Sequence, residues 1–104
     1  MFTRWRLNRE DAWQALLRGG QRLGRPIGDG ETVLEYGVGL ADHIMQRQTR
    51  EPDTARVAAH EVTVLSDAVN TFRYGPEPAR STAGVQVDEH WQRLRGYLPR
   101  ISRR

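Results

Sequence analysis

The three histidines are the side chains best suited to acid–base catalysis or metal binding. His43, His60 and His90 lie in separate segments, and no two of them have the i, i+4 spacing with which one helix presents a pair of imidazoles to zinc. The chain contains no cysteine, so it has neither a thiolate ligand nor a cysteine nucleophile. We therefore predict no metal site and interpret the histidines as surface or boundary residues.

Other catalytic signatures are also missing from the sequence. Ser66 and Asp67 are neighbours on a predicted helix, so their side chains point in different directions. There is no phosphate-binding loop, no nucleophile elbow and no pair of carboxylates spaced for a cleft. We predict no catalytic residue and no cofactor in this chain. An enzyme with its own site, built from residues such as His43, His60, His90 or Glu35, is a further alternative.

Two glycines inside a predicted helix require an explanation. Gly37 and Gly39 each cost about 1 kcal/mol of helix stability relative to alanine. We expect another helix, or a bulky ring such as Trp13 or Phe72, to approach closely at these positions. A phosphate cradle is the alternative, but a Gly-x-Gly cradle requires a strand-to-helix turn.

All 16 basic residues are arginine, and they are distributed unevenly. Residues 1–25 hold six arginines and two acids, residues 26–90 five arginines and eleven acids, and residues 91–104 five arginines and no acid. Basic ends on an acidic body fit simple solubility, or anionic lipid headgroups nearby, better than nucleic acid, which usually binds a basic stripe on the folded body. A small arginine-rich nucleic-acid-binding helical protein is the alternative function.

Apolar residues recur at helical spacing in four segments, and these segments must position the histidines and arginines described above. We predict helices at about 9–23, 32–46, 53–74 and 85–98, joined into a compact all-α bundle of four helices. Thr32 and Glu35 form a capping box at the start of the second helix. Tyr74 and Gly75 close the third helix, and Pro99 is expected to end the fourth.

Each predicted helix has its own apolar stripe. In the second helix the stripe and the row beside it cover a wide arc, so this helix is expected to lie centrally. The predicted core residues are Trp13, Leu16, Leu17, Gly20 and Leu23; Leu34, Val38, Ala41 and Met45, with Gly37, Leu40 and Ile44 beside them; Ala58, Val62, Leu65, Val69 and Phe72; and Val87, Trp91, Leu94 and Leu98.

The chain of 104 residues has the length of one domain. We interpret residues 1–8 as a basic lead-in segment, 9–98 as a single helical domain and 99–104 as a basic tail with nothing to pack. No apolar run is long enough to span a membrane, and because residues 1–10 are charged we expect no secretory leader there.

Three short motifs resemble a known bacterial family over residues 9–98. They are Gly-Glu-Thr-Val-Leu-Glu-Tyr at 30–36, Phe-Arg-Tyr-Gly at 72–75 and Trp-Gln-Arg-Leu at 91–94, preceded by Leu-Gly-Arg-Pro at 23–26. In order and spacing they resemble the C-terminal domain of unknown function of transglutaminase-like membrane proteins. That family prefers proline where this chain has Val33 and phenylalanine where it has Tyr36.

The resemblance implies an accessory role. In such proteins the catalytic domain lies outside the membrane, and a last membrane helix leads to this domain in the cytoplasm. It implies that Arg4, Arg6 and Arg9 follow that membrane helix, in agreement with the positive-inside rule. We therefore expect a non-catalytic protein-interaction or scaffolding domain, cytoplasmic at the inner face of the cell membrane. The expected partner is a protein, such as a membrane-anchored neighbour domain, held in a groove between the second and third helices.

Overall fold

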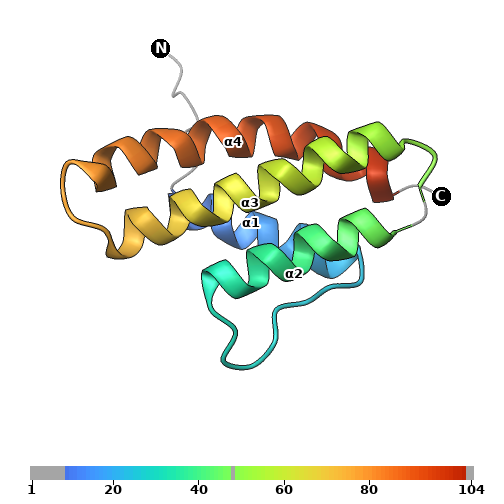
Figure 1. Cartoon of the computed structure of the whole chain (residues 1–104), viewed down its shortest axis with the longest axis horizontal. Coiled ribbons are helices and arrows are strands. Elements are labelled where there is room, and N and C mark those ends of the chain that lie inside the picture. The colour runs from blue at the N-terminus through green and yellow to red at the C-terminus, as the bar shows by residue number, and fades with distance from the viewer. Residues whose placement is uncertain (1–8, 48, 103–104) are drawn as a thin grey trace, which may run out of the picture.

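The computed structural model describes residues 9–47 and 49–102 of the chain. This part is helical, and no strand occurs in it (Figure 1). The predicted all-α bundle of four helices is confirmed. The helices are α1 (Arg9–Arg22), α2 (Val33–Gln46), α3 (Pro52–Tyr74) and α4 (Ala79–Ser102).

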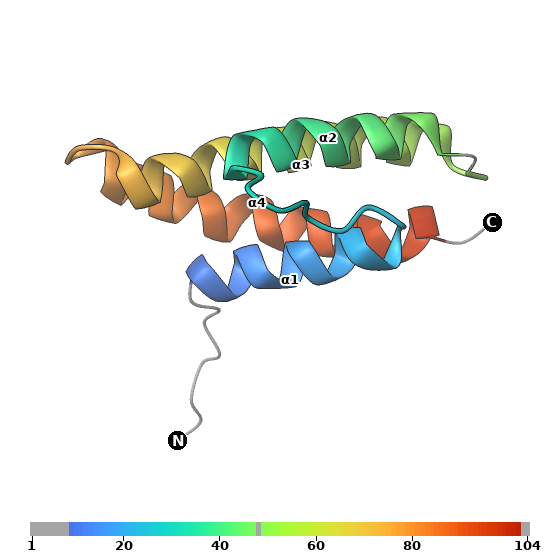
Figure 2. The same ribbon diagram turned by 90° about the horizontal axis from the view of Figure 1, so that it is seen from below.

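The helices pack as a bundle in which α3 is the central element. It lies between α2 and α4 and runs antiparallel to both, while α1 packs mainly against α4 on the far side (Figure 2). Helices α1 and α2 run in the same direction, so residues 23–32 must return along the bundle to connect them. The predicted central place of α2 is therefore wrong, because α2 lies at an edge.

The inner face of α2 differs from the predicted stripe. Its buried residues are Val33, Tyr36, Gly37, Leu40 and Ile44. The predicted stripe faces outward instead: Leu34 is 42%, Val38 56% and Met45 51% exposed. Tyr36 decides between the two rows, because burying an aromatic ring removes more apolar surface from water than burying one aliphatic side chain.

Gly37 marks the closest approach of α2 to α3. A Cβ atom at this position would overlap the hydroxyl and Cβ of Ser66, whose hydroxyl donates to the carbonyl of Val62 at 2.8 Å. The expected approach of another helix is confirmed, whereas neither Trp13 nor Phe72 is the neighbour. The glycine at position 39 is explained by a different neighbour, because a Cβ there would lie 2.5 Å from Nη2 of Arg25.

Replacing Gly37 by alanine is expected to lower the free energy of unfolding by about 1–3 kcal/mol. Alanine favours the helix by about 1 kcal/mol, but overpacking against a rigid helix costs more than that. Urea unfolding followed by circular dichroism measures the difference. In the double variant Gly37→Ala/Ser66→Gly the overlapping Cβ is gone, so part of the loss should be recovered. A Gly37→Ala variant more stable than the wild type would show that the two helices do not touch here.

The fourth helix is longer than predicted at both ends. It begins at Ala79, continues through Pro99 and ends at Ser102, so the expected stop at Pro99 is wrong. The expectation of an unpacked tail is wrong for Arg100 and Ile101, whereas residues 103 and 104 lie outside the described residues. Proline removes one helical hydrogen bond, but Ile101 is fully buried and its carbonyl accepts from Nε of Arg47 at 3.1 Å. Arg100 forms an ion pair with Glu51 at the start of α3.

The core of the bundle otherwise follows the predicted spacing. On α3 the buried row is Ala58, Val62, Leu65 and Val69, but Phe72 at its end is only half-buried. The row lies where α3 faces both neighbours, whereas Phe72 is in the last turn, two residues before the helix ends. None of the helices described is long and apolar enough to cross a lipid bilayer.

Candidate functional site

The histidines do not converge on a common site. His60 is exposed on α3, whereas Nε2 of His43 lies 2.6 Å from the carbonyl oxygen of Leu23. Because a carbonyl only accepts, Nε2 of His43 carries the proton and ties α2 to the end of α1. Within residues 9–47 and 49–102, no group of three or more histidine, cysteine, aspartate or glutamate side chains is arranged to hold a metal ion.

His90 takes part in a cluster that sequence reasoning missed. Its Nδ1 donates to Oε2 of Glu61 at 2.5 Å, and Nη1 of Arg93 lies 3.6 Å from the other carboxylate oxygen. Glu61 is buried on α3, while His90 and Arg93 are on α4. The position of Glu61 beside the apolar row of α3 is the sequence feature that could have indicated this buried carboxylate. The cluster joins α3 to α4 through the carboxylate of Glu61.

The capping motif at the start of α2 is present as predicted. The backbone N–H of Glu35 donates to Oγ1 of Thr32 at 3.1 Å, and the N–H of Thr32 donates to Oε1 of Glu35 at 2.9 Å. Such a cap contributes about 1 kcal/mol. At the end of α3, the N–H of Gly75 donates to the carbonyl of Thr71 at 2.7 Å, and Tyr74 is 74% exposed.

Two of these four motif residues meet in a cavity. Thr32 and Tyr74 both line a space of about 300 Å³ between the start of α2, the end of α3 and the ring of Trp13. Arg73 lies on its wall with its guanidinium 5.9 Å from the centre of that ring. Glu35 and Gly75 do not line it. The partner groove was expected between these two helices, and this cavity lies at one end of their contact.

The connection between α1 and α2 is held by a small polar network. Arg25 pairs with Glu31, and Oε1 of Glu31 also accepts from the N–H of Gly28 at 2.8 Å. The hydroxyl of Tyr36 donates to the carbonyl of Arg25 at 2.7 Å. The hydrogen bond from Arg25 holds the pKa of Glu31 below its usual value, and burial raises the pKa of Tyr36 to about 12. The network fixes the returning chain against α2.

The buried phenol makes stability sensitive to alkaline pH. Since the folded pKa of Tyr36 is raised, the folded state binds more protons than the unfolded state between about pH 10 and 12. Stability from this group is fully present below pH 10 and should fall by up to about 2–3 kcal/mol as the pH rises through 12. Urea titrations at several pH values measure this loss. The Tyr36→Phe variant, which cannot ionise, is expected to lose less over the same range, and equal losses would contradict the assignment.

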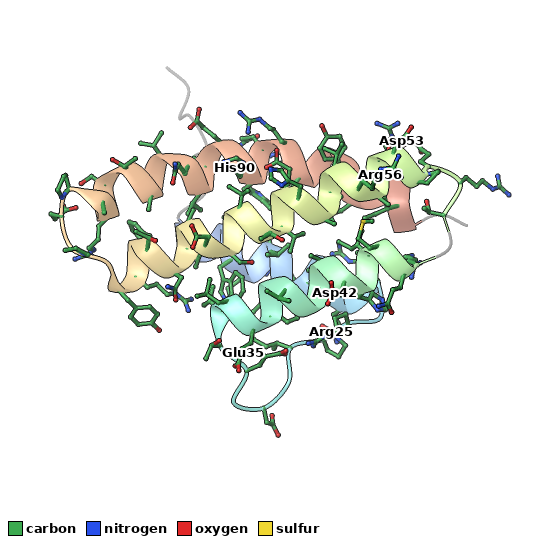
Figure 3. All side chains as sticks on the ribbon, viewed as in Figure 1. Arg25, Glu35, Asp42, Asp53, Arg56 and His90 are labelled. Atoms are coloured by element: carbon green, nitrogen blue, oxygen red, sulfur yellow. The ribbon has the colours of Figure 1, made fainter. Side chains whose placement is uncertain are left out.

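The exposed side of α2 carries a row of apolar residues that the core does not explain. We define the α2 outer face as Leu34, Val38, Ala41 and Met45, which recur at helical spacing and are exposed or half-exposed. Glu35 and Asp42 are exposed beside it and project from the same helix (Figure 3). Isolated exposed apolar residues are common, but a row along one helix is typical of an interaction surface.

The predicted membrane-proximal arginines are not tested by this geometry. Arg4 and Arg6 lie outside the described residues, and Arg9 is the first residue of α1. Of the four predicted motif residues, the structure brings together Thr32 and Tyr74 and leaves Glu35 and Gly75 in purely structural positions. Glu61, His90 and the α2 outer face are candidate features that the sequence did not predict.

Comparison with known proteins adds no assignment. No protein-family model, curated protein or solved structure matches the chain.

Proposed function

We propose that this chain is a non-catalytic interaction domain that binds a protein partner through the α2 outer face. The observation that carries the proposal is the exposure of Leu34, Val38 and Met45 on a helix whose opposite side already supplies five buried residues to the core. The fold does not need these three side chains for its own packing, and covering them removes apolar surface from water.

The geometry of the face favours a helical partner. Its residues follow the spacing i, i+4, i+7 and i+11, which is the ridge that one helix offers to another. Glu35 and Asp42 flank the row on one side, so complementary charge on the partner is basic. The proposed partner segment is an amphipathic helix with arginine or lysine beside its apolar stripe.

The wider setting of the proposal comes from the sequence motifs. We place the domain in the cytoplasm, at the inner face of a bacterial membrane, as an accessory domain like the one that ends transglutaminase-like membrane proteins. Its support is the order of the motifs at 30–36, 72–75 and 91–94 and the basic residues Arg4, Arg6 and Arg9. In this setting the catalytic residues belong to another domain.

The experiment compares three immobilised forms of the chain in an extract of the source cell. They are the wild type, the triple variant Leu34→Gln/Val38→Gln/Met45→Gln, and the control Val85→Gln, which changes an exposed valine on α4 (54% exposed). We expect a protein that the wild type and the control retain and the triple variant retains at least about tenfold less. A photoreactive group at position 38 should crosslink to a basic amphipathic helix of that protein.

Two results would overturn the proposal. One is a set of retained proteins that is the same for all three forms, because the α2 outer face would then not be the contact. The other is retention of nucleic acid in place of protein, with affinity that falls steeply as salt rises. That result would favour the alternative of a small arginine-rich nucleic-acid-binding protein.

A further inference from the structure

A second surface, on the other side of the bundle from α2, has a different chemistry. Helices α1 and α4 run parallel there, and a groove of about 490 Å³ lies between their C-terminal halves. Its apolar wall includes Leu23, Trp91 and Leu98. Gly19 lies on the same wall. A Cβ at this position would stand 2.9 Å from Cδ1 of Leu98, so the glycine lets α1 and α4 approach closely at the groove.

Three arginines line this arginine groove, which we define by Arg18, Arg22 and Arg95. All three are exposed, and no acidic residue is among the described residues around the space. Other arginines of the chain do have acidic partners: Arg25, Arg93 and Arg100 each lie beside a glutamate. Within the described part of the chain, the side chains of Arg18, Arg22 and Arg95 have no hydrogen bond or ion pair. Their guanidinium groups are therefore available to an external anion.

Trp91 is the second feature of the groove wall that the proposal uses. The side chain is 7% exposed, and its buried Nε1 has no hydrogen-bond acceptor among the residues that the structure describes. A buried N–H without an acceptor costs about 1–3 kcal/mol. Trp91 is also part of the groove wall, so a ligand in the groove would contact the side chain whose Nε1 is left without an acceptor.

We propose that the arginine groove binds an acidic peptide segment in which an apolar residue is flanked by glutamate or aspartate. The apolar side chain would contact Leu23, Trp91 and Leu98, and the carboxylates would pair with the three guanidinium groups. Planar guanidinium groups bind carboxylates with two parallel hydrogen bonds. A recess between two helices suits an inserted side chain better than a flat lipid surface or a rigid duplex.

The inference rests on the proposed function only in taking the partner to be a protein. It uses a different surface and a ligand of the opposite charge from the basic helix proposed for α2. A synthetic ligand can therefore test it without knowledge of the natural partner. If the peptide does not bind but protein capture still depends on the α2 outer face, only the proposal for the arginine groove is rejected. If the peptide binds but capture does not depend on the α2 outer face, only the proposed α2 contact is rejected.

The probe is a fluorescein-labelled synthetic peptide with a central leucine between pairs of glutamates, measured by anisotropy at low and moderate salt. We expect saturable binding that weakens about three- to tenfold for each of Arg18→Gln, Arg22→Gln and Arg95→Gln. The matched control is Arg80→Gln, which removes the same charge in the first turn of α4, at the other end of the helix. It should leave the affinity within about twofold. Circular dichroism checks that each variant is folded.

The peptide itself supplies the second set of controls. Replacing its glutamates by glutamine, or its leucine by serine, should abolish measurable binding, because each half of the groove then loses its ligand. In spectra of labelled protein, the indole resonance of Trp91 should shift on addition of the acidic peptide. The proposal is overturned if the wild type does not bind the peptide, or if Arg80→Gln weakens binding as much as the groove variants. It is also overturned if vesicles containing phosphatidylserine, or duplex DNA, bind the same arginines more tightly than the peptide does.

Discussion

Replacing Trp13 by alanine should lower the free energy of unfolding by about 3–5 kcal/mol, the range for a large buried aromatic side chain. Trp13 is almost fully buried, and its ring meets the ring of Tyr36 edge to face, with 5.9 Å between their centres. Few residues of α1 and α2 lie close together, and this ring pair joins the two helices. Chemical unfolding followed by circular dichroism measures the loss.

The neighbouring residue provides the control for this prediction. Gln14 is exposed on the same turn of α1, so Gln14→Ala should change stability by less than about 0.5 kcal/mol. Equal effects of the two substitutions would mean that α1 does not present Trp13 to the bundle. The Trp13→Phe variant should lie between the wild type and Trp13→Ala, because it keeps part of the ring contact with Tyr36.

Replacing Ile101 by alanine is expected to cost about 2–5 kcal/mol, the range for a fully buried aliphatic residue. This result distinguishes the structure from the sequence pattern, which treats residues 99–104 as a tail. Ile101 is fully buried three residues before the end of the chain, and Arg100 beside it pairs with Glu51. The loss should appear in the same unfolding experiment.

A matched substitution separates core packing from a general effect on α4. Val85 is more than half exposed on the same helix, so Val85→Ala is expected to change stability by about 0.5 kcal/mol or less. If Ile101→Ala were as harmless as Val85→Ala, the last turn of α4 would not pack on the bundle. The prediction of an unpacked tail would then be correct.

The helices themselves could be predicted because their signals are local. The spacing of apolar residues, the Thr32–Glu35 capping box and the Gly75 stop each depend on a few neighbouring residues. Pro99 shows where a local rule fails. A proline usually ends a helix, but the burial of Ile101 two residues later offsets the lost hydrogen bond.

The orientation of α2 could not be decided from its own residues. This helix carries two apolar rows, and either one satisfies the helical period. The choice depends on Ser66, which needs a glycine opposite it, and on Gly20, where a Cβ would overlap the hydroxyl of Tyr36. Both are contacts between segments far apart in the sequence.

The candidate sites were missed for the same reason. Glu61 and His90 are 29 positions apart, and Arg95 faces Arg18 and Arg22 only after α4 packs beside α1. Within one helix the sequence shows which residues are charged. It does not show which of those charges another helix will neutralise.

The most direct test of the account is the stability of the Leu34→Gln/Val38→Gln/Met45→Gln variant, because the proposed function requires that the α2 outer face is not needed for folding. Glutamine is a good helix former, so the free energy of unfolding should remain within about 1 kcal/mol of the wild type. A loss of more than about 3 kcal/mol would show that these side chains hold the bundle together. The α2 outer face would then be part of the core, and no surface would be left there for a partner.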